Sequence, residues 1–442
     1  MKSASEILKL SAIAIGMAIT ISCNTILVSL FPFVRGSTLL LSLIAAGLCM
    51  AVVVLCFSEL SSKFPGAIGI RAFSKYAFGN RFSVAATLFY VLMVLLIGGL
   101  EIYLCHLLLV SLFSPVLAGF ALLILLGFVL FVNLRGYELS LQLQILMTVG
   151  VVLMMCWLSI WAQNGASLIP TMSTLSTAAS AANSANDIDF LNAVPRALFL
   201  FIGIEWAVLH VTRHESFQRN LPIALMLAVV VIAGIYAQFA MALEARFATG
   251  ALAHFALPHL ELARVLNSNL AKGLVVIISL LAVLSSFNVG LSGAARILYS
   301  LGREAEIPAW FARLHGERLS PRNAMLFISA CVLIIAPLMS FETFNSSLSQ
   351  LLSFHLALIY ACVLLAWLVF RRRKDHRGVR HAMHPILVFC TAIFLLIIAG
   401  GVFFSPENQV MRGILIGEVC ALVVTNFFLF RFKNNKTQGH RA

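Results

Sequence analysis

Long apolar windows dominate this sequence and recur twelve times along it. Each window is long enough to cross a membrane as a helix, which takes about 20 apolar residues. A helix satisfies its backbone hydrogen bonds within itself, whereas a spanning strand needs a closed barrel and an alternation that these windows lack. The sequence therefore predicts an all-α, polytopic membrane protein of about 12 transmembrane helices, at residues 10–33, 37–58, 84–113, 117–134, 143–163, 190–212, 221–243, 270–295, 324–341, 347–370, 383–404 and 410–430.

Composition excludes a soluble globular protein and argues against a nucleic-acid-binding one. Hydrophobic residues make up 61% of the 442 residues and charged residues only 11%, less than half the ~25% that is usual in soluble domains. The net charge of +13 would suggest nucleic acid in a soluble protein, but here the basic residues lie between apolar windows. The first window follows Lys2 and Lys9, as in a signal peptide, but it is too long and lacks a clear cleavage site. We expect it to be retained.

The distribution of Lys and Arg predicts the orientation in the membrane. With the N-terminus placed inside, 24 of the 30 Lys and Arg residues fall in cytoplasmic segments. Because basic residues concentrate on the cytoplasmic side, we expect a protein of the cytoplasmic (inner) membrane with both termini cytoplasmic. Residues 164–189, rich in Ser, Ala and Asn, then form an extracytoplasmic loop.

Cysteines and histidines indicate no metal or disulfide chemistry. The nine Cys residues are scattered, almost all within apolar windows, and no CxxC pair occurs. His376, His381 and His384 lie together in a short basic segment, but no Cys or carboxylate completes a ligand set. We expect no metal ion and no cofactor.

Three carboxylates lie well inside the apolar windows, and these carry the strongest chemical signal. They are Glu101, Glu205 and Glu418. Ionisable residues within a membrane are costly and tend to be functional. Burial favours the protonated form of a carboxyl group, so each is a candidate for proton coupling or for pairing with a cationic ligand. Glu418 has no supporting motif, and a helix-bridging role is favoured for it.

Three motifs resemble those of the amino acid–polyamine–organocation (APC) permeases. Residues 57–79 read FSELSSKFPGAIGIRAFSKYAFG, which is similar to that family's Glu-Leu…Pro…Gly…Tyr…Gly stretch, with Phe73 in place of the Tyr. Residues 197–225 resemble the family's Phe-x-Gly-x-Glu helix and the loop that follows it, and residues 288–324 resemble its Arg-Glu…Pro…Phe stretch. Residues 190–212 are also similar to the arginine/agmatine antiporter, and the overall pattern resembles bacterial amino acid exporters.

This resemblance implies a LeuT-like fold, in which two inverted five-helix repeats are followed by two peripheral helices. The first repeat would cover residues 1–163 and the second residues 190–372, with the peripheral helices in residues 373–442. In such folds the first helix of each repeat is broken near the midplane. The free N–H groups and carbonyls of the half-helices then bind the substrate.

The resemblance also implies the residues of a substrate site. It places the second break at Phe201, Ile202 and Gly203, an aromatic gate at Phe199 and a gating or proton-linked carboxylate at Glu205. Other expected contributions are a close approach at Gly98, attraction of a cation by Glu101 and a hydroxyl group at Ser286. The first break is expected within Ser22, Cys23, Asn24, Thr25 and Ile26, although this stretch lacks the family's usual glycines.

The substrate and the coupling ion stay open at this stage. Val151 stands where some relatives carry a proton-coupling Lys, so coupling by protons would use Glu205 or Glu101. Sodium coupling would require hydroxyl ligands such as those of Ser285 and Ser286. Phe201 and Trp206 favour a neutral, hydrophobic substrate over a cationic one.

The favoured function is a secondary transporter for amino acids or related amines, proton-coupled or exchanging. Its partners are the substrate, the lipid bilayer and a proton or counter-substrate, with no nucleic acid, and a homodimer is compatible with it. One alternative is a transport-inactive sensor or partner subunit of the same fold. The other is an intramembrane serine protease, because residues 290–293 read Gly-Leu-Ser-Gly around Ser292. No His motif follows to activate that serine, so no enzyme is expected.

Overall fold

The computed structural model describes residues 2–64, 69–164, 187–210, 215–247, 257–315, 320–373, 383–405 and 408–438. Within these ranges the chain is helical apart from turns and one isolated bridge between His315 and Ser320. The all-α prediction is confirmed. The expected loop 164–189 lies outside the described residues except at its two ends.

Seven helices are described between Lys2 and Asn164. They are α1 (Lys2–Ala18), α2 (Ile21–Val28), α3 (Gly36–Lys63), α4 (Gly69–Phe78), α5 (Asn80–Val110), α6 (Pro115–Arg135) and α7 (Tyr137–Asn164). The short helix α4 joins two long apolar helices and packs on α5 and α14.

The described residues from Asp187 onward form α9 (Asp187–Phe199), the 3₁₀ segment η2 (Ile204–His210), α10 (Glu215–Glu244), α11 (Pro258–Val265), α12 (Asn269–Arg303), η3 (Ala309–Ala312), α13 (Arg322–Ile335), η4 (Ala336–Ser340), α14 (Glu342–Arg372), α15 (Pro385–Phe404) and α16 (Gln409–Gln438). Within the described residues, each of the twelve apolar windows overlaps one or more helices.

Of the described residues, nine unbroken helices are long and apolar enough to cross a membrane, and α1 with α2 forms a tenth candidate, bent by 57°. The window 190–212 is divided between α9 and η2, and the window 410–430 falls within α16. The structure thus agrees with a polytopic bundle of about the predicted size, with two of its helices interrupted.

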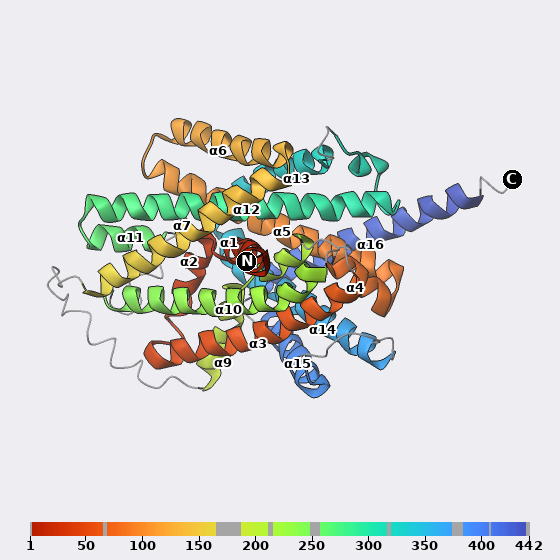
Figure 1. The fold of residues 1–442 in the computed structure, drawn as a ribbon, viewed down its shortest axis with the longest axis horizontal. Helices are drawn as coiled ribbons and strands as arrows, with labels where there is room; N and C mark the ends of the chain where they lie inside the picture. Colours follow the sequence, from red (N-terminus) through yellow and green to blue (C-terminus); the bar gives the residue numbers. More distant parts are fainter. Residues whose placement is uncertain are drawn as a thin grey trace.

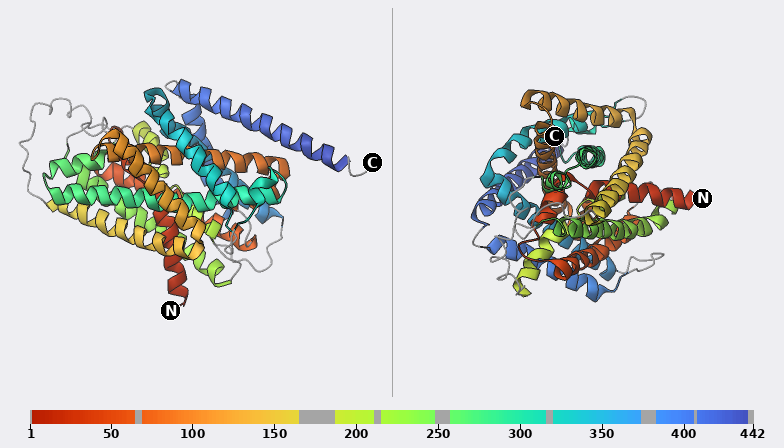
Figure 2. Two further views of the ribbon diagram at one scale, coloured as in Figure 1. Left: turned by 90° about the horizontal axis from the view of Figure 1, so that it is seen from above. Right: turned by 90° about the vertical axis from the view of Figure 1, so that its left-hand side faces the viewer.

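The helices pack around α1, α2, α9 and the middle of α5 and α12. Figure 1 shows α10 and α12 running across the molecule on either side of α1, which is seen nearly end-on. Figure 2 shows α6 (orange) and α7 (yellow) on the outside of the bundle, with the C-terminal helix extending past it. The helix α1 packs against α7, α10, α12 and η2, so the broken segments lie at the centre.

Candidate functional site

Two helix breaks lie beside each other in the middle of the bundle. Between α1 and α2 the chain leaves the helix at Ile19 and Thr20, and Thr20 is extended (φ −116°, ψ 165°). Between α9 and η2 it turns at residues 200–203, and Gly203 has φ +96°. A Cβ atom on Gly203 would lie 2.5 Å from Cγ of Met17, so the two breaks are in contact.

The second break lies where it was expected and the first does not. Phe201, Ile202 and Gly203 all fall in the turn, as the resemblance implied. The residues expected to be unwound in the first break, Ser22 to Ile26, lie instead within α2. The physical reason is the cap: Thr20 accepts a hydrogen bond from the Cys23 amide at 3.3 Å, which starts the new helix at Ile21.

Glu101 reaches from α5 to this new helix start. Its two carboxylate oxygens accept hydrogen bonds from the backbone N–H of Ile21 at 3.1 Å and of Ser22 at 3.0 Å. The side chain is buried, with 2% exposure. A helix N-terminus carries unpaired N–H groups and a partial positive charge, and a carboxylate satisfies both. Glu101 therefore closes the positive end of α2.

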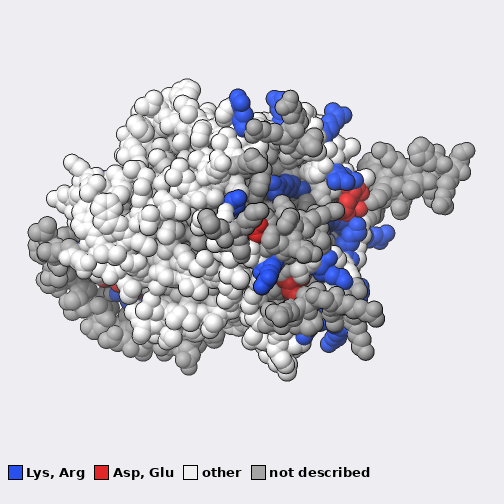
Figure 3. All heavy atoms as spheres, viewed as in Figure 1, with Lys and Arg blue, Asp and Glu red and all other residues white. Residues whose placement is uncertain are grey.

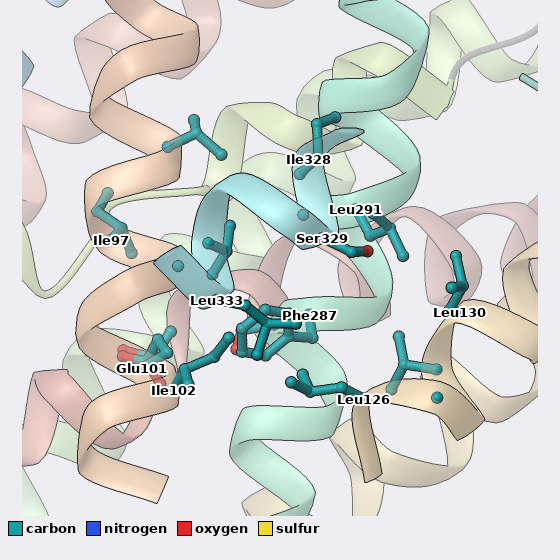
Figure 4. Close-up of a pocket in the computed structure, with 18 of the residues that line it drawn as sticks. Ile97, Glu101, Ile102, Leu126, Leu130, Phe287, Leu291, Ile328, Ser329 and Leu333 are labelled. Atoms are coloured by element: carbon teal, nitrogen blue, oxygen red, sulfur yellow. The ribbon is translucent and has the colours of Figure 1, made fainter. Parts of the chain in front are cut away.

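A cavity of about 230 Å³ lies between α5, α6, α12 and α13, next to the break in α1. Gly98, Glu101 and Ser286, all predicted site residues, line it. Figure 4 shows Glu101 on one wall, with Phe287 and Ser329 among the side chains around the cavity. The remaining lining is mostly apolar, with hydroxyl groups at Thr20 and Ser329. Phe199, Phe201 and Ile202 are buried in the neighbouring core and do not line this cavity.

Glu205 ties the second break to two other helices. Its carboxyl group accepts hydrogen bonds from the Tyr90 hydroxyl on α5 at 3.0 Å and from the Tyr360 hydroxyl on α14 at 2.8 Å. The backbone N–H of Gly203 donates to it at 3.1 Å. Sequence reasoning identified Glu205 and missed both tyrosines, because they come from distant segments.

A buried amide–hydroxyl network holds α1 to α7 and α12, and sequence reasoning missed it too. The Gln144 side-chain amide donates to Ser285 at 2.7 Å, and Ser285 donates to the Gly16 carbonyl at 2.9 Å. Asn288 donates to Gln144 at 3.0 Å. The Ser286 hydroxyl instead donates to the Val283 carbonyl in its own helix. The two hydroxyls considered for sodium therefore have different partners.

Two further groups from the sequence analysis lie apart from the breaks. Glu418 on α16 approaches His355 on α14, with 3.1 Å between Oε2 and Nε2, although these atoms are not in hydrogen-bonding geometry. This contact links two helices, in keeping with a bridging role. The Ser292 hydroxyl donates to the Val289 carbonyl. Among the described residues no cluster of His, Cys, Asp and Glu could hold a metal ion, and His376 and His381 lie outside those residues.

Charged residues gather at one end of the molecule (Figure 3). There the Arg71 guanidinium on α4 donates to Glu304, just beyond α12, at 2.8 Å, and Lys75 lies 3.1 Å from the same carboxylate. Partial burial opposes ionisation of Glu304, but hydrogen bonds from Lys75 and Arg71 outweigh it and lower the pKa of that carboxyl group. This cluster fixes α4 against the end of α12.

Comparison with known proteins gives one family and several distant relatives. The model of the family described as amino acid permease matches residues 6–425, most of the chain. An uncharacterised transporter of Rhizobium meliloti is 24% identical over 62% of this chain and 59% of its own length. A vacuolar cationic amino acid transporter of Arabidopsis thaliana is 31% identical over 36% of this chain, and a probable threonine/serine transporter of Bacillus subtilis 25% identical over 39%. The matches span 26–59% of the lengths of these three relatives.

Proposed function

The chain belongs to the amino acid permease family, and from that premise we propose that it is a secondary active transporter of amino acids or related amines. Members of this family are transporters and not enzymes, so the protease alternative at Ser292 is excluded. We propose that it moves its substrate across the cytoplasmic membrane by alternating access. Residues 1–163 and 190–372 would be the two inverted repeats that the LeuT-like fold of the family implies, with residues 373–442 peripheral.

The contact between the two helix breaks is the observation that carries this proposal. A membrane helix is broken only where the freed backbone groups line a cavity or are bound within the protein. Here the breaks meet at Met17 and Gly203, and a cavity lies next to the first of them. That arrangement suits a solute which binds at the break and is released when the surrounding helices rock.

Glu205 is the proposed coupling group. It joins the turn at Gly203 to Tyr90 and Tyr360, which stand on two different helices. Gain or loss of a proton changes which hydrogen bonds a carboxyl group makes. Protonation of Glu205 would therefore alter the contact between α5, α14 and the second break. A proton, or a second substrate molecule in exchange, would drive the cycle.

Counterflow in proteoliposomes tests this function. Vesicles are preloaded with a mixture of amino acids and amines, and entry of labelled methionine, leucine, arginine or agmatine is followed at about pH 5.5 and about pH 7.5. We expect saturable exchange of at least one label. We expect Glu205→Gln to slow it about tenfold or more, or to abolish its dependence on pH. Glu418→Gln, which removes another membrane carboxylate far from the breaks, is the matched control and should retain exchange.

A transport-inactive sensor of the same fold is the competing function. It predicts that correctly folded protein exchanges none of these labels, nor any of a wider panel of amino acids and amines. Folding is checked by a single symmetric peak in size-exclusion chromatography. Exchange of any label by the wild-type protein would exclude the sensor.

A further inference from the structure

The N-terminal end of α2 already holds a carboxylate, and that carboxylate belongs to the protein. The half-helix at a break is where an anionic substrate group would ordinarily bind. In this chain the first two N–H groups of α2, at Ile21 and Ser22, donate to Glu101. The third, at Cys23, donates to the Thr20 hydroxyl. The first three N–H donors of the half-helix are therefore bound within the chain.

The ionisable residues of the cavity also argue against a substrate carboxylate at this site. Among the described residues that line it, Glu101 is the one ionisable group, and Thr20, Ser286 and Ser329 add hydroxyls. No lysine, arginine or histidine of the lining could pair with a substrate carboxylate. Each of the two Glu101 oxygens accepts one backbone N–H, and a carboxyl oxygen has a further lone pair that an ammonium group in the cavity could use. An anion would be repelled here and a cation attracted.

The other residues of the lining determine which kind of ligand side group the cavity can hold. Side chains such as Ile97, Phe287, Leu291 and Val332 surround the cavity, so it suits an apolar group. A diamine would leave its second ammonium among these side chains with no second carboxylate, at a high desolvation cost.

We propose that the substrate is a hydrophobic primary monoamine without a carboxylate. Its ammonium group would lie against Glu101 and the Thr20 hydroxyl, and its apolar body would fill the cavity between α5, α6, α12 and α13. Glu101 supplies the carboxylate that an amino acid would otherwise bring. This inference rests on the proposed transport function, and it replaces the neutral substrate favoured from the sequence with a cationic one.

Matched pairs of ligands test the proposal directly. Each pair joins an amino acid to its decarboxylated amine: leucine with 3-methylbutylamine, phenylalanine with 2-phenylethylamine, and methionine with 3-(methylthio)propylamine. Purified wild-type protein is assayed for counterflow of each labelled compound and for a rise in unfolding temperature on binding. We expect the amine of each pair to be preferred about tenfold or more, since a site with one fixed charge discriminates strongly. Putrescine, a diamine, should bind weakly.

Variants of Glu101 give a second measurement. Glu101→Ala opens the N-terminus of α2 and should reverse the preference, so that the amino acid of a pair binds better than the amine. Glu418→Gln leaves the cavity lining unchanged and should keep the wild-type preference. If Glu101→Ala fails to fold, the wild-type comparison still decides the matter.

The outcomes separate the two proposals. Exchange of amino acids with no gain for the amines would overturn the monoamine assignment and leave the transport function standing. A preference for putrescine would also overturn it, in favour of a diamine. No exchange and no stabilisation by any compound, from folded protein, would remove the transport function and the substrate assignment together.

Discussion

At the residue scale, His259 gives the protein a pH-dependent stability. It stands on α11, outside the membrane-spanning helices, with 2% exposure and no hydrogen-bond partner for either ring nitrogen. Burial lowers the pKa of His259 from 6.5 to about 4. The unfolded chain therefore binds a proton more readily than the folded protein. Stability is complete above about pH 6.5 and declines as the pH falls towards 4, by about 3 kcal/mol in total.

His259→Phe should remove this decline, because phenylalanine keeps a buried ring and has no titratable group. The measurement is the unfolding temperature in detergent at about pH 7.5 and about pH 5. Leu262→Ala, at a fully buried position of the same helix, is the packing control and should lower both temperatures alike. An equal drop with pH in wild type and His259→Phe would contradict the role given to His259.

At the scale of elements, the turn between α9 and η2 depends on one glycine. Gly203 has φ +96°, and an added Cβ would lie 2.5 Å from Met17 Cγ and 3.3 Å from the Met17 backbone carbon. A side chain in such a backbone conformation costs about 1–3 kcal/mol, before the contact with Met17 is counted. We expect Gly203→Ala to lower the unfolding temperature and to abolish exchange.

The variant Gly234→Ala in α10 is the matched control for this turn, since nothing lies within 4 Å of its added Cβ. We expect it to retain exchange. Met17→Ala combined with Gly203→Ala removes the Cγ contact but leaves the Met17 Cβ at 3.2 Å and the backbone strain, so stability should recover only in part. Full activity of the single variant Gly203→Ala would show that the turn tolerates other conformations.

The two breaks also show how far sequence alone reaches at this scale. The turn at residues 200–203 falls where the resemblance to the APC permeases implied the second break. The first has no glycine, and its position follows from the Thr20 cap and from the Glu101 carboxylate. The partner of that carboxylate lies about 80 residues away in the chain, so no local pattern discloses it. Tyr90, Tyr360 and Gln144 were missed for the same reason.

For the whole molecule, the twelve apolar windows were enough to predict the class of fold. Backbone hydrogen bonding in lipid leaves helices as the only choice for such windows, and α3, α5 and α12 follow them closely. The cavity was not predictable in this way. It is formed by side chains from α5, α6, α12 and α13, whose packing depends on tertiary contacts.

The orientation of the whole molecule is the last prediction. Lys and Arg gather at the end where α4 meets α12 (Figure 3), and basic segments stay in the cytoplasm. We expect a green fluorescent protein fused after Ala442 to fluoresce, and alkaline phosphatase inserted within residues 164–189 to be active outside. If the C-terminal fusion did not fluoresce and the inserted phosphatase were inactive, the protein would have the opposite orientation. With the predicted orientation, α11 and His259 face the outside, so external acidification is the condition that would lower the protein's stability.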